Sequence, residues 1–330
     1  MTDDARMTGL VLSGTGGVWR VHLADGSIVD ATLRGRVKKS NAGRRADGSL
    51  RRDTIASAAE TLKLAVGDRV VLETDESCGA LAIGEILPRR SRLARRVPGG
   101  GQGERIVAAN VDQVLIVFAA ANPEPHPRML DRFLVIAEAN QLAARIVINK
   151  VELVGGAEVA RARWMDYERA GYPVHYTSVK KREGLEDLHD VLAGVVTVLT
   201  GPSGVGKSSL LNAMFPGLEL RVGEISESVN KGRHTTVGGY VHPLPGAEGY
   251  VVDTPGLREV GMWMLSPSEL DACFPEIRTR SDACRFADCT HQHEPECAVR
   301  DAVSRGEVSS ARYESYLKLR AELQDTKVVW

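Results

Sequence analysis

Alternation of apolar and polar residues dominates the first quarter of the chain and is typical of short β strands. Segments of this kind, each bounded by turn residues, lie at 9–12, 18–23, 28–33, 68–73 and 80–86. Five short strands at this spacing indicate a small barrel, and the oligonucleotide-binding (OB) fold is the common five-stranded form. We therefore predict an OB-fold β-barrel over residues 1–88.

From residue 111 the pattern changes to apolar runs separated by segments with helical periodicity. Strands are predicted at 114–118, 145–148, 174–177, 195–199 and 250–252, and amphipathic helices at 129–143 and 157–170. Strands that alternate with helices build a doubly wound α/β sheet, so we predict one such domain over residues 106–262. The segment 89–105, rich in Arg and Gly, is predicted to be a linker between barrel and sheet.

After residue 262 the chain leaves the predicted sheet. Ser266 and Glu269 have the spacing of a capping box, which marks the beginning of a helix. A further helix is predicted over 303–323. We therefore predict a mainly helical unit over residues 263–330.

A glycine-rich segment between a predicted strand and a predicted helix matches the phosphate-binding pattern GxxxxGK[ST] in full. In this pattern backbone N–H groups close around the β-phosphate, Lys207 reaches the β and γ oxygens, and Ser208 ligates Mg²⁺. The segment therefore predicts a nucleotide site. Its candidate binding residues are Gly201, Ser203, Gly204, Val205, Gly206, Lys207, Ser208 and Ser209.

The choice of base depends on the residues after the strand at 145–148. Asn149, Lys150 and Glu152 follow the guanine-specificity pattern NKxD, with Glu in place of the usual Asp. The carboxylate of this pattern accepts hydrogen bonds from guanine N1–H and the 2-amino group, which adenine does not offer. Ser178 occupies the place of the loop that backs the guanine. These residues predict binding of GTP and GDP.

Asp253 and Gly256 form the pattern DxxG directly after the strand at 250–252. In this pattern the Asp side chain holds Mg²⁺ through water, and the Gly N–H senses the γ-phosphate. Leu257 stands where Ras-type enzymes place the glutamine that orients the attacking water. Because an alkyl side chain cannot orient water, intrinsic hydrolysis is expected to be slow.

The segment between the phosphate loop and Asp253 carries KGRHTTV in the place of a first switch segment. Thr235 or Thr236 is predicted to close on Mg²⁺ and the γ-phosphate, and we favour Thr236. His234 is hypothesised to position or deprotonate water; a solvated histidine is the alternative.

Cys284, Cys289, His291 and Cys297 have the spacing C-x4-C-x-H-x5-C. Three thiols and one imidazole are the ligand set of a closed, tetrahedral Zn²⁺ site, so the site is predicted to be structural. His293 is an alternative to His291. The polar surroundings argue against ordinary core cysteines.

The chain has 330 residues, of which 43% are hydrophobic and 26% charged, as expected of a globular protein with several cores. The longest apolar stretch, 114–121, is much shorter than the ~20 residues that span a bilayer. Since the first residues also lack a signal-peptide core, we expect a cytoplasmic protein without a membrane partner. The remaining cysteines, Cys78 and Cys273, are predicted to be core or inert residues. A monomer is expected because no heptad run stands out.

Positive charge is concentrated in two segments. Residues 34–52 contain eight Lys or Arg and one acid, and residues 89–105 contain six Arg and one Glu. Such clusters favour a polyanionic partner. Exposed loops without any partner are the alternative, because Lys and Arg are common in them.

The guanine motif precedes the phosphate loop in this chain, whereas it follows the loop in Ras-type GTPases. The rotated order, the barrel, the segments GRHTT, DTPGLREVGMW and RIVAANVD, and the Cys/His cluster closely resemble the bacterial ribosome small-subunit-dependent GTPase A family. The resemblance implies a circularly permuted GTPase that acts late in assembly, binds 16S rRNA of the 30S subunit near its decoding region, and hydrolyses GTP there. Departures are Glu152, Val179 in place of Ala, and the arginine-rich insertion at 40–52.

Two other functions are alternatives for a chain with these nucleotide motifs and basic segments. One is a permuted GTPase of large-subunit assembly, against which the barrel and the Cys/His cluster argue. The other is an RNA-binding scaffold in which the nucleotide only stabilises the fold. For the small-subunit GTPase we hypothesise that GTP fixes the barrel and the zinc unit in one orientation and that hydrolysis releases them.

Overall fold

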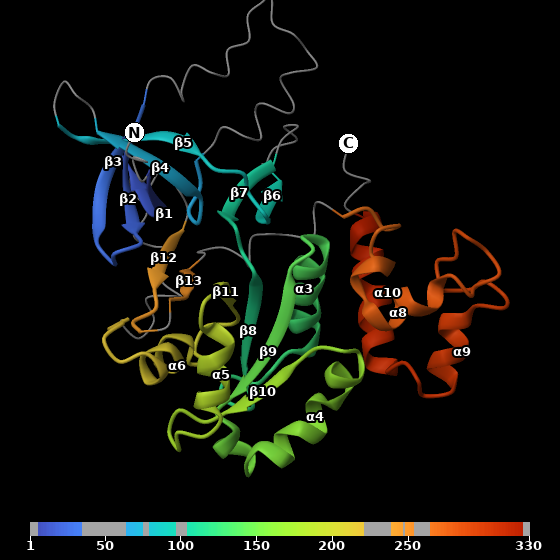
Figure 1. Cartoon of the computed structure of the whole chain (residues 1–330). Helices are drawn as coiled ribbons and strands as arrows, with labels where there is room; N and C mark the ends of the chain where they lie inside the picture. The colour runs from blue at the N-terminus through green and yellow to red at the C-terminus, as the bar shows by residue number, and fades with distance from the viewer. Residues whose placement is uncertain are drawn as a thin grey trace, which may run out of the picture.

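The computed structural model describes residues 6–34, 64–74, 79–96, 104–220, 239–246, 248–253 and 265–325. A barrel, a central α/β domain and a helical C-terminal unit follow one another along the chain. Figure 1 shows the barrel and the C-terminal helices on opposite sides of the central sheet. Most of the basic segment 34–52 and Cys78 lie outside the described residues.

The N-terminal strands close into the predicted five-stranded barrel. Its strands are β1 (Met7–Thr15), β2 (Val18–Leu23), β3 (Ile28–Leu33), β4 (Arg69–Thr74) and β5 (Leu81–Ile86), in the order β1-β2-β3-β5-β4, with β1 paired to β4. Alternate side chains point inward because successive residues of a strand face opposite sides. Val11, Val21, Val70 and Ile83 fill the interior and are fully buried.

A two-stranded ribbon joins the barrel to the sheet. It pairs β6 (Arg92–Arg96) with β7 (Glu104–Ala109) in antiparallel fashion. The segment predicted as a linker, 89–105, therefore contains a strand. In the sequence, arginines stand on both sides of Leu93 and Ala94, which are buried.

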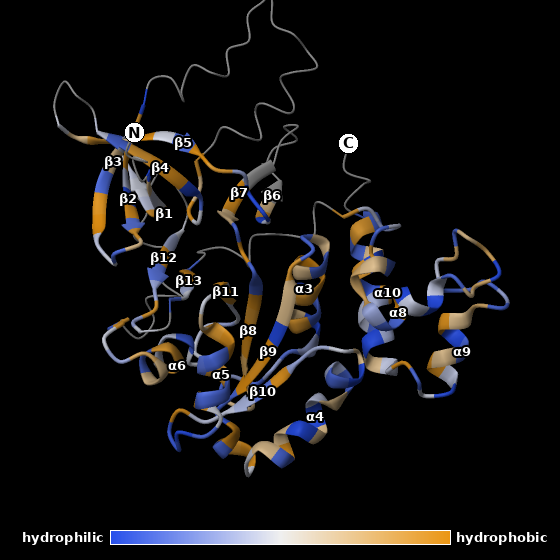
Figure 2. Ribbon diagram, viewed as in Figure 1, coloured by the Kyte–Doolittle hydropathy of each residue, from blue (hydrophilic) through white to orange (hydrophobic). Residues whose placement is uncertain are grey.

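The central sheet has the order β10-β9-β8-β11-β13-β12. Its strands are β8 (Gln113–Ala119), β9 (Ala143–Asn149), β10 (Val174–Thr177), β11 (Val196–Thr200), β12 (Tyr240–Pro243) and β13 (Tyr250–Asp253). The first five strands of the order run parallel, and only the edge strand β12 is antiparallel to its neighbour. The doubly wound α/β prediction is confirmed. Figure 2 shows the apolar character of the inner strands β8, β9 and β11, as expected for a sheet covered on both faces.

Helices cover both faces of this sheet. The core on one face contains residues of α3 (Pro127–Ala139) and α4 (Ala157–Arg169). The core on the other face contains residues of α5 (Leu185–Leu192) and α6 (Lys207–Met214). Among the described residues, no helix combines the length and apolarity needed to cross a membrane.

The C-terminal unit consists of η3 (Asp271–Cys273), α8 (Pro275–Ser281), α9 (Ala298–Ser304) and α10 (Ser310–Asp325). The predicted capping box is present, because the backbone N–H of Ser266 donates to Glu269 Oε2 at 2.8 Å, but it opens a turn and a short 3₁₀ helix. The single helix predicted over 303–323 is wrong. Gly306, with φ of +71°, breaks it, and Val308 enters the core between α9 and α10.

Candidate nucleotide and metal sites

The predicted nucleotide-binding motifs meet at one edge of the sheet. Asn149 ends β9, the phosphate loop follows β11, and Asp253 ends β13. The strands β9, β8, β11 and β13 are neighbours in that order, so the loops after them share the carboxyl edge, where open α/β sheets bind ligands.

The phosphate loop passes close over the backbone of β8, and this path requires glycine. Gly201 has φ of +137°, and a Cβ placed on it would lie 2.0 Å from the Val117 carbonyl oxygen. Gly206 has φ of +96°, and its Cβ would lie 2.6 Å from Asn149 Nδ2. Any larger residue would push the loop away from the sheet. The loop therefore keeps its backbone N–H groups near the beginning of α6, where an anion is favoured.

Two predicted phosphate and magnesium ligands lie at the beginning of α6. Lys207 and Ser208 are 6% and 5% exposed. The Lys207 ammonium donates to the carbonyl oxygens of Gly201 and Pro202 at 3.0 and 2.7 Å, so it lies within the curve of its own loop. Ser203 and Ser209 belong to the same loop and helix.

The guanine motif is fastened to the phosphate loop. Asn149 is buried, and its Nδ2 donates to the Val205 carbonyl oxygen at 2.9 Å. The Lys150 ammonium donates to the Gly204 carbonyl oxygen at 2.7 Å and to the Asn122 carbonyl oxygen. The base-selecting and phosphate-binding segments thus form one unit, although they lie far apart in the sequence.

Glu152 supplies an acceptor that the protein leaves unused. It lies in the short 3₁₀ helix η1 (Val151–Val154), and its Oε2 atom is buried without a hydrogen-bond partner in the described residues. A buried carboxylate oxygen without a donor is costly, which fits a place that a ligand donor fills. Ser178 is fully buried, and its hydroxyl accepts the Lys181 N–H at 3.1 Å, which fixes the turn after β10.

Asp253 stands beside the phosphate loop. In the register of β11 and β13 it pairs with Leu199, two residues before Gly201, and it is 6% exposed. This is a position from which a carboxylate and Ser208 can hold a divalent cation bound to phosphate. The other predicted residues, His234, Thr235, Thr236, Gly256 and Leu257, lie outside the described residues.

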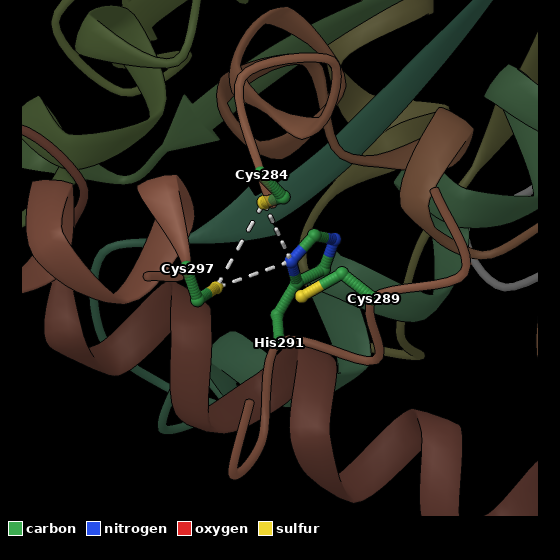
Figure 3. A group of neighbouring side chains, drawn as sticks. All are labelled: Cys284, Cys289, His291 and Cys297. Carbon is green, nitrogen blue, oxygen red and sulfur yellow. Dashed lines mark hydrogen bonds between the residues drawn. The ribbon is translucent and has the colours of Figure 1, made fainter. Parts of the chain in front are cut away.

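The four predicted zinc ligands come together, as Figure 3 shows. Their ligand atoms all lie within 4.8 Å of one another. His291 Nδ1 lies 3.4 Å from Cys297 Sγ and 3.6 Å from Cys284 Sγ, and the two sulfurs are 3.9 Å apart. Ligands at about 2.0–2.3 Å around a tetrahedral Zn²⁺ would be separated by ~3.5–3.8 Å. The donor set and its spacing therefore fit zinc.

Side chains outside the ligand set hold the loop in shape. Glu294 accepts hydrogen bonds from the backbone N–H groups of Thr290 and Gln292 at 2.8 and 3.0 Å. The Tyr313 hydroxyl of α10 donates to the His291 carbonyl oxygen at 2.5 Å, so α10 packs against the cluster. His293 is exposed and lies outside the cluster.

Different surroundings shift the pKa values of His291 in the cluster and of Cys273, the remaining described cysteine. Burial lowers the pKa of His291, but the Asp271 carboxylate and the Cys297 thiol outweigh burial and raise it above the usual value. Cys273 is buried beside the cluster, and burial raises the pKa of its thiol to about 12. Cys273 packs in the apolar core of the C-terminal unit, as expected of a core cysteine.

Comparison with known proteins gives one consistent result. Residues 86–263 match the family model described as RsgA GTPase. A protein of Gemmatimonas aurantiaca named small ribosomal subunit biogenesis GTPase RsgA is 57% identical over 96% of this chain and 97% of its own length. The protein of the same name from Bacteroides fragilis is 36% identical over 97% of this chain and 98% of its own length.

Two solved structures share the whole architecture. YjeQ from Thermotoga maritima has a TM-score of 0.75 and 34% identity, covering 97% of this chain and 99% of its own. YloQ, described as a circularly permuted GTPase, has a TM-score of 0.73 and 27% identity, covering 100% of this chain and 99% of its own. These similarities extend through the barrel and the C-terminal unit as well as the central domain.

Proposed function

The chain belongs to the RsgA GTPase family, and from this membership we propose that it is a GTPase of small ribosomal subunit biogenesis. It hydrolyses GTP to GDP and phosphate, slowly alone and faster on the 30S subunit. The observation that carries the proposal is the attachment of Asn149 and Lys150 to the phosphate loop, in a chain 57% identical to a relative of that name.

The guanine end of the substrate is read by Glu152. Its buried Oε2 accepts the N1–H and 2-amino hydrogens that only guanine presents there. A carboxylate one methylene longer than Asp reaches the base from η1, whose first residue, Val151, is packed into the core. The expected consequence is a preference for GTP over ATP. If Glu152→Ala discriminated between the two nucleotides as well as the unaltered protein does, this role would be excluded.

The phosphate end is held by the loop 201–208. Its N–H groups and Lys207 surround the β- and γ-phosphates, and the Lys207 ammonium exchanges the carbonyl oxygens of its own loop for phosphate oxygens. Ser208, Thr236 and, through water, Asp253 would hold Mg²⁺. When bound, Mg²⁺ neutralises charge that develops on the phosphate oxygens.

Hydrolysis is assigned to the segments around the γ-phosphate. His234 positions or deprotonates the attacking water, Thr235 or Thr236 closes over the γ-phosphate, and the Gly256 N–H senses it. Leu257 cannot orient water, which supports a slow reaction in the absence of the subunit. His234→Ala is expected to lower turnover strongly and to leave nucleotide affinity nearly unchanged. Unchanged turnover would remove His234 from the mechanism.

Zinc is the proposed metal of the C-terminal cluster, where it is structural. Three thiols and one imidazole supply four ligands, so no position is left for a substrate. The partner is the 16S rRNA of the 30S subunit, and the basic residues of 34–52 and 89–105 supply phosphate contacts. We propose that the protein works as a monomer in the cytoplasm.

The nucleotide state is proposed to set the orientation of the two flanking units. In the sequence, Asp253 is followed by the segment that leads to the C-terminal unit. Tyr240 of β12 and Tyr250 of β13 make side-chain hydrogen bonds to the barrel. GTP would hold both units in the arrangement that binds the subunit, and hydrolysis would release them.

The decisive experiment is steady-state hydrolysis of GTP and ATP by the purified protein alone, with 30S and with 50S subunits. Stimulation by 30S alone, with GTP preferred, is the expected result. Stimulation by 50S alone would instead support a factor of the large subunit. No stimulation by either would favour a scaffold that nucleotide only stabilises.

A further inference from the structure

The proposed metal ligand His291 has a second ring nitrogen that the cluster does not use. Nδ1 faces the thiols of Cys284 and Cys297. Nε2 points the other way, is buried, and makes no hydrogen bond within the described residues. It lies 3.4 Å from Asp271 Oδ2, which is an ion-pair distance. A buried N–H requires an acceptor, and the Asp271 carboxylate is placed to be one.

The Asp271 carboxylate is itself held by α10. Its other oxygen, Oδ1, accepts the Tyr316 hydroxyl at 2.6 Å and Arg320 Nη1 at 3.3 Å. Arg320 Nη1 also donates to the Pro267 carbonyl oxygen at 2.6 Å, which fixes the guanidinium. Burial raises the pKa of Tyr316 and the Asp271 carboxylate raises it further, so its hydroxyl stays protonated and donates. The two carboxylate oxygens thus serve different partners, His291 and α10.

We propose that Asp271 is the positioning residue of the metal centre, accepting the Nε2–H of His291. This contact fixes the ring orientation and the tautomer, so that Nδ1 keeps its lone pair for the metal. A carboxylate behind a metal-bound histidine also makes the imidazole a stronger donor. The inference rests on the proposed metal site and is independent of the ribosomal role.

The arrangement joins the metal centre to the central domain through one helix. The Tyr313 hydroxyl of α10 donates to the His291 carbonyl oxygen, and the Tyr316 hydroxyl donates to Asp271 Oδ1. Arg312, one turn earlier, donates to Asp131 Oδ1 of α3 at 2.5 Å. Because α10 makes both sets of contacts, loss of the metal is expected to loosen the docking of α10.

The test compares metal affinity in full-length variants by competition between zinc and a chromophoric chelator. Asp271→Asn removes the charge and is expected to weaken binding by about 10–100-fold, as for other such partners. Asp288→Asn is the matched control, because it removes one exposed carboxylate from the loop between Cys284 and Cys289. It should bind zinc as the unaltered protein does. Equal affinity of Asp271→Asn and the unaltered protein, or equal weakening in both variants, would overturn the inference.

Tyr316→Phe provides a second test that leaves every carboxylate in place. Loss of its hydroxyl leaves Asp271 Oδ1 with only the 3.3 Å contact to Arg320 among the described residues, and should speed zinc release to the chelator several-fold while GTP hydrolysis by the isolated protein is retained. An unchanged release rate would contradict the inference even if Asp271→Asn failed to fold. Failure of the ribosomal proposal would alter neither readout, so the two can be judged separately.

Discussion

At the barrel, attachment to the central domain is made by backbone groups and apolar side chains, whereas at the C-terminal unit a buried ion cluster is added to the apolar packing of Val135. On the barrel side, Leu10, Leu12 and Val66 belong to the same apolar core as the sheet. The Ala109 N–H donates to the Val66 carbonyl oxygen at 2.9 Å. His22 Nδ1 lies 2.8 Å from the Tyr250 hydroxyl, at the edge of the contact.

On the opposite side, one guanidinium connects three helices. Arg312 of α10 is 3% exposed; it donates to Asp131 of α3 at 2.5 Å and to both oxygens of Glu276 of α8 at 2.8 and 3.3 Å. The Tyr167 hydroxyl also donates to Asp131, at 3.0 Å. Around this cluster the guanidinium lies against the Phe274 ring, 4.6 Å from its centroid.

The two attachments are expected to differ in how much free energy of unfolding they lose when a side chain is changed. Apolar contacts lose free energy gradually as atoms are removed, and they leave nothing unsatisfied. A buried ion cluster contributes little net stability when intact, but removing one partner leaves a charge buried alone. We therefore expect the barrel contact to respond mildly to change and the C-terminal contact to respond sharply.

Removal of the metal should have the largest effect, and only on the C-terminal side. Cys297→Ser, or chelation of the metal, should speed hydrogen exchange of the amides in α8, α9 and α10 by more than about 10⁴-fold, at about 1.4 kcal/mol for each factor of ten. The barrel amides should not change. Cys273→Ser, at a buried cysteine outside the cluster, is the control. Equal loss of protection in the barrel would contradict independent attachments.

Arg312→Met should follow in size. It leaves the Asp131 and Glu276 carboxylates buried without their cation, and is expected to lower the free energy of unfolding by about 3–5 kcal/mol in urea titrations. Arg305→Met removes an exposed ion pair with Glu307, which water screens, and should leave the free energy of unfolding nearly unchanged. Similar losses in both variants would show that burial of the cluster does not matter.

Gly67→Ala probes the barrel junction. Gly67 has φ of +84°, and its Cβ would lie 2.2 Å from the Ala109 carbonyl oxygen. Gly26 has a similar φ of +85° with open space around it. Gly26→Ala therefore reports the backbone strain alone, about 1–2 kcal/mol, and Gly67→Ala should lose more. The same loss in both would mean that the junction can move apart freely.

Tyr250→Phe should have the smallest effect. It removes one partly buried hydrogen bond to His22 and is expected to cost about 0.5–1.5 kcal/mol in the same urea titrations. Tyr240→Phe, whose hydroxyl accepts only a 3.5 Å exposed contact from Arg20, is the comparison and should be close to neutral. A loss above about 3 kcal/mol for Tyr250→Phe would contradict the expectation that the barrel contact responds mildly to change.

Local patterns account for what the sequence predicted well. The phosphate loop, the guanine motif and the four metal ligands each lie within short segments whose spacing is set by their chemistry. Alternation was sufficient for the barrel strands. It failed for β6, because the charged residues around Leu93 suggest an exposed loop although Leu93 is buried. The helix predicted over 303–323 failed because Gly306 was not recognised as a helix break.

Long-range partners had no local signal. Arg312 and Asp131 are separated by 181 residues, and nothing near either one indicates the other. Asp271 precedes the first metal ligand and has no motif spacing to His291, so its position behind the imidazole emerges only from the folded chain. The hydrogen bonds of Asn149 and Lys150 to the phosphate loop likewise depend on the strand order of the sheet.

The central claim is that nucleotide state governs attachment to the small subunit. The most direct measurement is sedimentation of the protein with purified 30S subunits in the presence of a non-hydrolysable GTP analogue, of GDP, or of no nucleotide, with 50S subunits in parallel. The account predicts strong retention on 30S with the analogue, release with GDP, and little binding to 50S in any state. Equal retention on 30S in all nucleotide states would contradict it.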